Sequence, residues 1–225
     1  MDLQLNDRVV LVVGGTGLIG SAVADRLRRE GATVVVASRH ATDGTRIDAS
    51  DDRSVQDGVA QVLREHGRID GLVVTAAPAA QTLDPSRRSD PAQVVAAVEA
   101  KAMTFLRVAS AVVPTMRGAG FGRIVVVSGQ NAYLTGNITG SVRNAATSLV
   151  AKNLADELAG TGVAVNVVNP GTVAREPEKK VTAGQGGQSS PEQIADLVAF
   201  LVSPLSAVSG ESIAIGHRVL GVTTL

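Results

Sequence analysis

The stretch that decides the fold is Val9-Val10-Leu11-Val12-Val13-Gly14-Gly15-Thr16-Gly17-Leu18-Ile19-Gly20. Its apolar run is typical of a buried strand, and its glycines stand where that strand would turn directly into a helix. At such a turn the backbone can approach a pyrophosphate, which the free N–H groups and the positive dipole of the helix start would bind. The stretch therefore predicts a dinucleotide-binding unit rather than a glycine-rich turn that serves packing alone.

Val-rich runs and helical stripes alternate along the rest of the chain. Runs of strand type occupy residues 8–13, 33–37, 72–75, 123–128 and 163–168. Between most of them the apolar residues recur at helical spacing, with two long helices expected at 91–117 and 140–159. This alternation predicts an α/β fold, a Rossmann-type doubly wound parallel sheet in three α/β/α layers. The length fits one dinucleotide-binding domain over residues 1–225.

Two segments depart from regular alternation. Only a few residues separate the second strand from Arg46-Ile47-Asp48, whereas a parallel crossover usually takes a dozen or more. One crossover helix is therefore expected to be missing. The polar stretch 170–190 is long for a loop in a compact domain, which favours a functional or mobile segment.

Composition excludes several classes of function. The net charge is zero with no basic stripe, so neither nucleic acid nor an anionic membrane surface is an expected partner. There is no cysteine, and the three histidines are scattered without ligand spacing, so no metal site is expected. The first residues lack the pattern of a secretory signal, and no apolar run approaches the roughly 18 residues of a membrane helix. These features predict a cytoplasmic protein.

The end of the second strand predicts which dinucleotide is bound. An NAD-selective site normally places an acid there, but this chain has Ser38-Arg39-His40. Arg39 could form a bidentate, charge-assisted contact with a 2′-phosphate, which favours NADP(H) over NAD(H). The alternative is that Arg39 and His40 are solvated loop residues.

Across nearly its whole length the chain resembles the short-chain dehydrogenase/reductase family. The resemblance rests on the glycine-rich turn, Asp48, and the runs 67–74, 122–128, 166–171 and 190–211. The shortened crossover is similar to compact members such as dihydropteridine reductases. The resemblance, together with the glycine turn and the second strand, predicts the residues that contact the cofactor: Gly14, Thr16, Gly17, Leu18, Ile19, Gly20, Ser38, Arg39, Asp48, Ala49, Thr75, Ala76, Pro170, Gly171 and Val173.

The chain departs from the family at its catalytic motifs. The family's Asn-Asn-Ala-Gly run is replaced by Val74-Thr75-Ala76-Ala77, and its helix asparagine falls at about Ala100, next to Lys101. Counting back along the later helix places the motif tyrosine at Gly140 and the motif lysine at Asn144. The resemblance implies that the tyrosine exchanges the proton that accompanies hydride transfer and that the lysine lowers its pKa, so the usual mechanism is excluded.

Four residues are candidates for the missing chemistry: Ser128, Tyr133, Arg143 and Asn144. Ser128, or Gly129 beside it, matches the family's catalytic serine. Tyr133 is the only tyrosine, and its phenol could reach a bound carbonyl or could merely cover the pocket. Arg143 could hold an anionic substrate or a developing oxyanion. Asn144, with Ser141, could instead cap a helix. Lys101 and Lys152 are expected to be solvated.

Three functions remain open. The first is an NADP(H)-dependent oxidoreductase of a small molecule, with its proton supplied by Tyr133 or by water on Ser128. The second is a redox-silent subunit that supports an active homologue. The third is a non-redox lyase, isomerase or cyclase. The Ala-rich faces of 91–117 and 140–159 suit a four-helix interface, so either a homo-oligomer, dimer or tetramer, or a hetero-oligomer is expected.

Overall fold

A computed structural model of the chain describes residues 2–41, 44–78 and 82–221. Seven parallel strands form one sheet in the order β3-β2-β1-β4-β5-β6-β9. Their bounds are β1 (Val9–Val13), β2 (Thr33–Ser38), β3 (Thr45–Arg46), β4 (Gly71–Val74), β5 (Gly122–Val127), β6 (Val163–Pro170) and β9 (Ser212–Ile215). This is the predicted doubly wound sheet, and because all strands are parallel their carboxyl ends meet at one edge.

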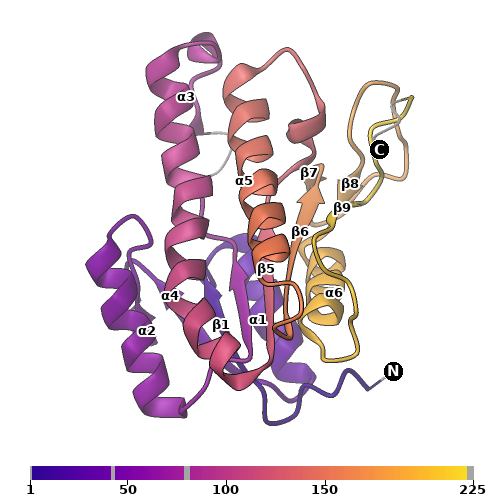
Figure 1. The fold of residues 1–225 in the computed structure, drawn as a ribbon. Helices are drawn as coiled ribbons and strands as arrows, with labels where there is room; N and C mark the ends of the chain where they lie inside the picture. The colour runs from indigo at the N-terminus through magenta and orange to yellow at the C-terminus, as the bar shows by residue number, and fades with distance from the viewer. Residues whose placement is uncertain (1, 42–43, 79–81, 222–225) are drawn as a thin grey trace.

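Helices cover both faces of the sheet (Figure 1). The helices are α1 (Leu18–Arg29), α2 (Asp52–His66), α3 (Pro91–Val98), α4 (Thr104–Ala119), α5 (Ile138–Glu157) and α6 (Pro191–Val202). One apolar core lies between the sheet and α2, α4 and α5, and the other lies between the sheet and α1 and α6. The central strands β1, β4, β5 and β6 are buried almost throughout, which explains their continuous apolar runs.

The long helix predicted at 91–117 contains an irregular turn. Residues Glu99–Met103 form a π-helical turn, η3, between α3 and α4, so that the three elements run as one column beside α5 in Figure 1. A π turn widens the helix by one residue and rotates the side chains that follow, and such turns are frequent at functional sites. The other long helix, α5, begins two residues before the predicted start at 140.

The two predicted irregular segments also have defined structures. No helix separates β2 from β3 in the described residues, as expected from the short connection. The stretch 170–190 includes two short paired strands, β7 (Thr172–Val173) and β8 (Gln188–Ser189). A short 3₁₀ turn, η4 (Gln130–Tyr133), follows β5, and another, η2 (Pro85–Arg87), precedes α3. None of the described helices is long and apolar enough to cross a lipid bilayer.

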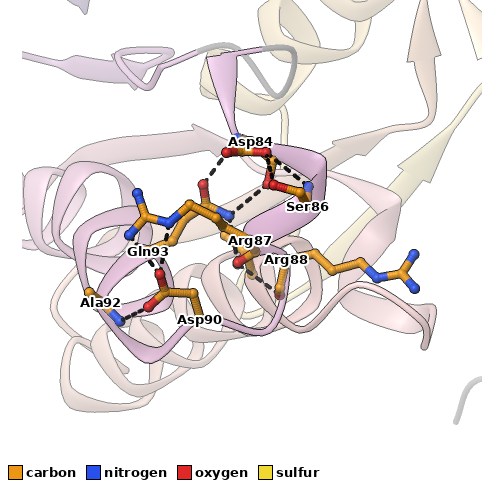
Figure 2. Close-up of polar contacts among 8 residues, drawn as sticks. Asp84, Ser86, Arg87, Arg88, Asp90, Ala92 and Gln93 are labelled. Carbon is orange, nitrogen blue, oxygen red and sulfur yellow. Dashed lines mark hydrogen bonds and ion pairs between the residues drawn. The ribbon is translucent and has the colours of Figure 1, made fainter.

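A polar network ties the segment before α3 to the start of α5. Figure 2 shows the carboxylates of Asp84 and Asp90 accepting from backbone N–H groups and Gln93 joining the two turns. The side chain of Arg88 points away from this network, but its carbonyl accepts from the N–H and hydroxyl of Thr139 (both 2.9 Å). The network therefore holds the first turn of α5 against the segment 84–93.

Candidate active site

The glycine-rich turn has the geometry of an anion-binding helix start. Gly14 has a φ of +86°, which favours glycine, and a side-chain atom there would lie 2.6 Å from the Ala76 nitrogen. Gly17 begins α1 without a side-chain cap, and no acidic residue occupies the first helical turn. The first N–H groups of α1 are thus left for a ligand, and the helix dipole favours a negative one.

A cleft of about 410 Å³ runs along the carboxyl edge of the sheet from β2 to β4. It lies where the chain reverses direction across the sheet, between β1 and β4, which is where such sheets bind ligands. Its lining includes the predicted cofactor residues Gly14, Thr16, Gly17, Ser38, Arg39, Asp48, Ala49, Thr75 and Ala76. These residues fit a bound dinucleotide, because the glycine turn and the polar side chains that end or follow β2 and β3, Ser38, Arg39 and Asp48, line the same cleft.

The other predicted cofactor residues lie beside the cleft. Leu18, Ile19 and Gly20 open α1, while Pro170 ends β6 and Val173 lies in β7. Gly171 packs closely against the carbonyl oxygen of Gly187, which a side-chain atom at 171 would approach to 2.0 Å. The segment after β6 is therefore held in place by the residue that leads into β8, Gly187.

Hydrogen bonds from Thr75, which follows β4, hold the glycine turn in place. The Thr75 hydroxyl donates to the carbonyl oxygen of Gly14 (3.1 Å), and the Thr75 N–H donates to Val13 (2.9 Å). In the part of the cleft that follows β3, hydrogen bonds from Ser50 lower the pKa of Asp48. Asp48 therefore stays ionised, and Arg39 is close enough to contribute to that shift.

The position that the resemblance assigns to the motif tyrosine is filled by other side chains. A side-chain atom at Gly140 would lie 3.2 Å from the Asn131 amide nitrogen and 3.3 Å from Asn137. Asn137 caps α5 by accepting from the Gly140 N–H (2.9 Å). A tyrosine at 140 would therefore require both asparagines to move.

Asn144 does not cap a helix, which corrects one of the alternatives left open by the sequence. The cap of α5 is Asn137, and Asn144 lies beyond the first turn with only 4% of its surface exposed. Its Oδ1 accepts from Lys101 Nζ at 2.6 Å. The Ser128 hydroxyl lies 3.2 Å from the Asn144 carbonyl oxygen and 3.4 Å from Oδ1. Asn144 therefore links Ser128, at the end of β5, to Lys101 in η3 through hydrogen bonds.

The expectation that Lys101 is solvated is wrong. Lys101 is 5% exposed, and it belongs to the π turn η3, which directs it toward α5. Burial, with a smaller effect from the nearby charge of Arg143, lowers its pKa from 10.5 to about 7. Ala100, the position assigned to the family's asparagine, lines the cleft instead. Helical periodicity could not reveal this, because a regular helix would place residue 101 differently. Lys152 is exposed, as expected.

Arg143 is also buried, with 6% of its surface exposed. Its Nη1 donates to the carbonyl oxygen of Pro78, a cleft-lining residue, over a long 3.4 Å. Burial lowers its pKa, but a guanidinium remains charged at any ordinary pH. For Tyr133 the structure describes the backbone, within η4, and its side chain lies outside the described residues.

The buried lysine predicts a pH-dependent stability. The folded-state pKa of Lys101 is lowered, so between about pH 7 and 10.5 the unfolded chain binds more protons and stability rises with pH. Lys101→Met removes this dependence. We expect the wild-type chain to gain about 2 kcal/mol relative to Lys101→Met between pH 7 and 9. Urea unfolding of both proteins measures this, and parallel stability curves would show that Lys101 is not desolvated.

Comparisons with known proteins agree with this geometry. The family model described as enoyl-(acyl carrier protein) reductase matches residues 16–217. The chain is 32% identical to dehydrogenase/reductase SDR family member 4 of Bos taurus, over 94% of this chain and 86% of that protein. The chain belongs to the short-chain dehydrogenase/reductase family.

Two further likenesses concern assembly and fold. The chain is 32% identical to a (2S)-[(R)-hydroxy(phenyl)methyl]succinyl-CoA dehydrogenase subunit of Thauera aromatica, covering 95% of this chain and 94% of that subunit. The crystal structure titled ribose-5-phosphate isomerase from Brucella melitensis superposes with a TM-score of 0.82. It shares 24% identity, and the match covers 96% of this chain and 93% of that one, so it supports the fold alone. Members of the short-chain dehydrogenase/reductase family generally bind a nicotinamide cofactor and small-molecule substrates, and they commonly form oligomers.

Proposed function

We propose that this chain is a cytoplasmic, single-domain NADP(H)-dependent carbonyl–alcohol oxidoreductase whose proton is not supplied by a tyrosine at position 140. The observation that carries the proposal is the buried set of Lys101, Asn144 and Ser128 beside the intact dinucleotide cleft. When bound, the nicotinamide would supply or accept a hydride. A proton must accompany that hydride, and Lys101 is the group in this set whose pKa lies near neutrality.

The residues of this set have distinct roles in the proposal. Lys101 Nζ holds the proton, and Asn144 fixes its position through the 2.6 Å hydrogen bond. The Ser128 hydroxyl, bonded to Asn144, orients the substrate oxygen or a water molecule. Their burial excludes bulk water, so the proton goes to the substrate oxygen rather than to solvent.

Arg39 supplies the proposed preference for NADP(H). It lines the cleft at the end of β2, where an acid would favour NAD(H). We expect Arg39→Ala to weaken NADPH binding about 10- to 100-fold, the range for a lost charge-assisted contact, and to leave NADH binding nearly unchanged. Fluorescence titration measures both, with Arg53→Ala as the control, since Arg53 is an exposed arginine outside the cleft. Equal loss for both dinucleotides would contradict the assignment.

A second candidate, the redox-silent subunit, has its own supporting observation. Large apolar side chains are exposed on α3 and α5, among them Val95 (69%), Leu149 (64%) and Ile138 (50%), which suits an interface with another copy or with a homologue. The relative from Thauera aromatica is itself described as a subunit. Light scattering of the purified chain tests the homo-oligomer, dimer or tetramer, against the hetero-oligomer.

One assay separates the functions. Substrate-dependent oxidation of NADPH by the chain alone supports the oxidoreductase. Turnover that appears only after co-expression with a relative carrying the Tyr-x-x-x-Lys motif supports the silent subunit. Product formation with unchanged NADPH absorbance would identify a lyase, isomerase or cyclase. Failure to bind either dinucleotide would leave the silent subunit as the better proposal.

A further inference from the structure

Two buried cations, Lys101 and Arg143, lie beside the cleft, and no carboxylate among the described residues forms an ion pair with either. Lys101 projects from η3 and Arg143 from α5, and the charge of Arg143 acts on Lys101 strongly enough to lower its pKa. Within the described part of the chain, neither side chain forms an ion pair, and their hydrogen bonds go to an amide oxygen and a carbonyl oxygen. Arg26, by contrast, contacts two carboxylates.

Burying two like charges is unfavourable, and the protein has only one way to reduce the penalty by itself. Arg143 keeps its charge, so Lys101 must give up its proton. The groups that face Lys101 are Arg143 and Asn144 from α5, and the neutral Ser128 next to Asn144 at the end of β5. None of them is negative. A bound anion would satisfy both side chains at once, and Arg143 has donors to spare because its one hydrogen bond is long.

We propose that Lys101 and Arg143 together bind a carboxylate group of the substrate, which is therefore an oxo acid in one direction and a hydroxy acid in the other. This inference rests on the oxidoreductase proposed above. The cleft that holds the cofactor reaches the same place, since Pro78, which accepts from Arg143, and Ala100, next to Lys101, both line it. A carboxylate bound there would place the adjoining carbonyl close to Lys101 Nζ.

Binding of the substrate's carboxylate would also keep Lys101 protonated, so that it can donate the proton that the reduction needs. A carboxylate beside Lys101 favours the charged form of the amine and raises its pKa, so Lys101 takes up a proton when the substrate binds. In the reduction, the carbonyl carbon accepts the hydride, its π electron pair moves to oxygen, and that oxygen takes the proton from Lys101 Nζ. The neutral amine regains a proton from solvent only after the product has left and the site is open again. A substrate without the carboxylate would leave Lys101 largely deprotonated above pH 7.

The test is calorimetry on the full chain saturated with NADP⁺, which prevents reduction of the probe. The probes are 2-oxobutanoate and phenylglyoxylate, each compared with its methyl ester, in phosphate-free buffers of different ionisation enthalpy. We expect the acids to bind at least 10-fold more tightly than the esters. With Lys101 titrating at about 7, binding at pH 8 should take up most of one proton, and binding at pH 6 should take up little.

Variants distinguish binding by Lys101 and Arg143 from nonspecific electrostatic attraction of the acid to the protein. Lys101→Met should abolish the proton uptake. It should also reduce the preference for the acid over the ester at least 10-fold. Arg143→Gln should weaken acid binding while leaving ester binding unchanged, and Lys101→Met still carries the test if that variant does not fold. Lys152→Met removes an exposed lysine of α5 that pairs with Asp156, and it should change neither quantity.

Three outcomes overturn the inference. The acids and esters could bind equally, the acids could bind without proton uptake at pH 8, or acid binding could occur only in the absence of NADP⁺. The last result would mean that the pair binds a phosphate of the cofactor. If NADPH binds but the acids are not preferred over the esters, the proposed anion site is wrong and the proposed oxidoreductase activity is unaffected. If the acids bind with proton uptake but no NADPH is oxidised, the proposed redox function is wrong and the proposed anion site is supported.

Discussion

Asn144→Lys is expected to lower the free energy of unfolding by about 3 kcal/mol at pH 7, and Lys101→Asn in the same chain to recover most of that loss. Asn144 is buried against Lys101, with Oδ1 2.6 Å from Nζ, and Arg143 adds a second positive charge nearby. A lysine at 144 would bring a third unneutralised cation into this space. In the double variant one lysine again faces one asparagine, but the lysine now lies on α5 and the asparagine on η3.

The measurement is a double-mutant cycle by urea unfolding. Lys101→Asn alone should be mild, because it leaves two neutral amides in contact. We expect a coupling energy of about 2 kcal/mol between positions 101 and 144, which is large for a single pair of residues. Additive effects would show that the two side chains do not depend on each other. The resemblance assigns the lysine to α5 and the asparagine to the preceding helix, so a strong coupling would support a reciprocal exchange of these residues in this chain.

Gly20→Ala is expected to abolish dinucleotide binding and to lower the free energy of unfolding by about 3 kcal/mol. A side-chain atom at 20 would lie 2.2 Å from the Gly14 carbonyl oxygen and 2.8 Å from the Gly15 Cα. Both contacts are with backbone, so the glycine turn itself must shift. Isothermal titration with NADPH and thermal unfolding measure the two effects.

Two matched glycine variants test whether the effects have separate causes. At Gly17 the nearest atom to a new side chain is 3.4 Å away, so Gly17→Ala should keep the stability within about 0.5 kcal/mol but lose NADPH affinity by crowding the pyrophosphate. At Gly118 in α4 nothing lies within 4 Å, and Gly118→Ala should keep full binding and gain about 0.5 kcal/mol. Unchanged NADPH binding in Gly17→Ala would show that the dinucleotide does not cross this turn.

The parallel sheet, the glycine-rich turn from strand to helix and the missing crossover helix could all be predicted from the sequence alone. These features depend on local chemistry: strands buried on both faces must be apolar throughout, and a turn that the backbone of Ala76 approaches this closely must use glycine at Gly14. The loss of the motif tyrosine and lysine could likewise be inferred by counting along α5, because a regular helix preserves spacing.

Only the tertiary structure reveals which side chains surround those positions. No feature of the sequence indicates that Lys101 is buried, because a lysine in an amphipathic helix is ordinarily solvated and the π turn at Glu99–Met103 breaks the periodicity on which such predictions depend. Asn144 could be a cap or a contact until Asn137 was seen to cap α5. The hydrogen bond between Lys101 and Asn144 joins residues 43 positions apart in the chain, so it exists only once η3 and α5 pack together.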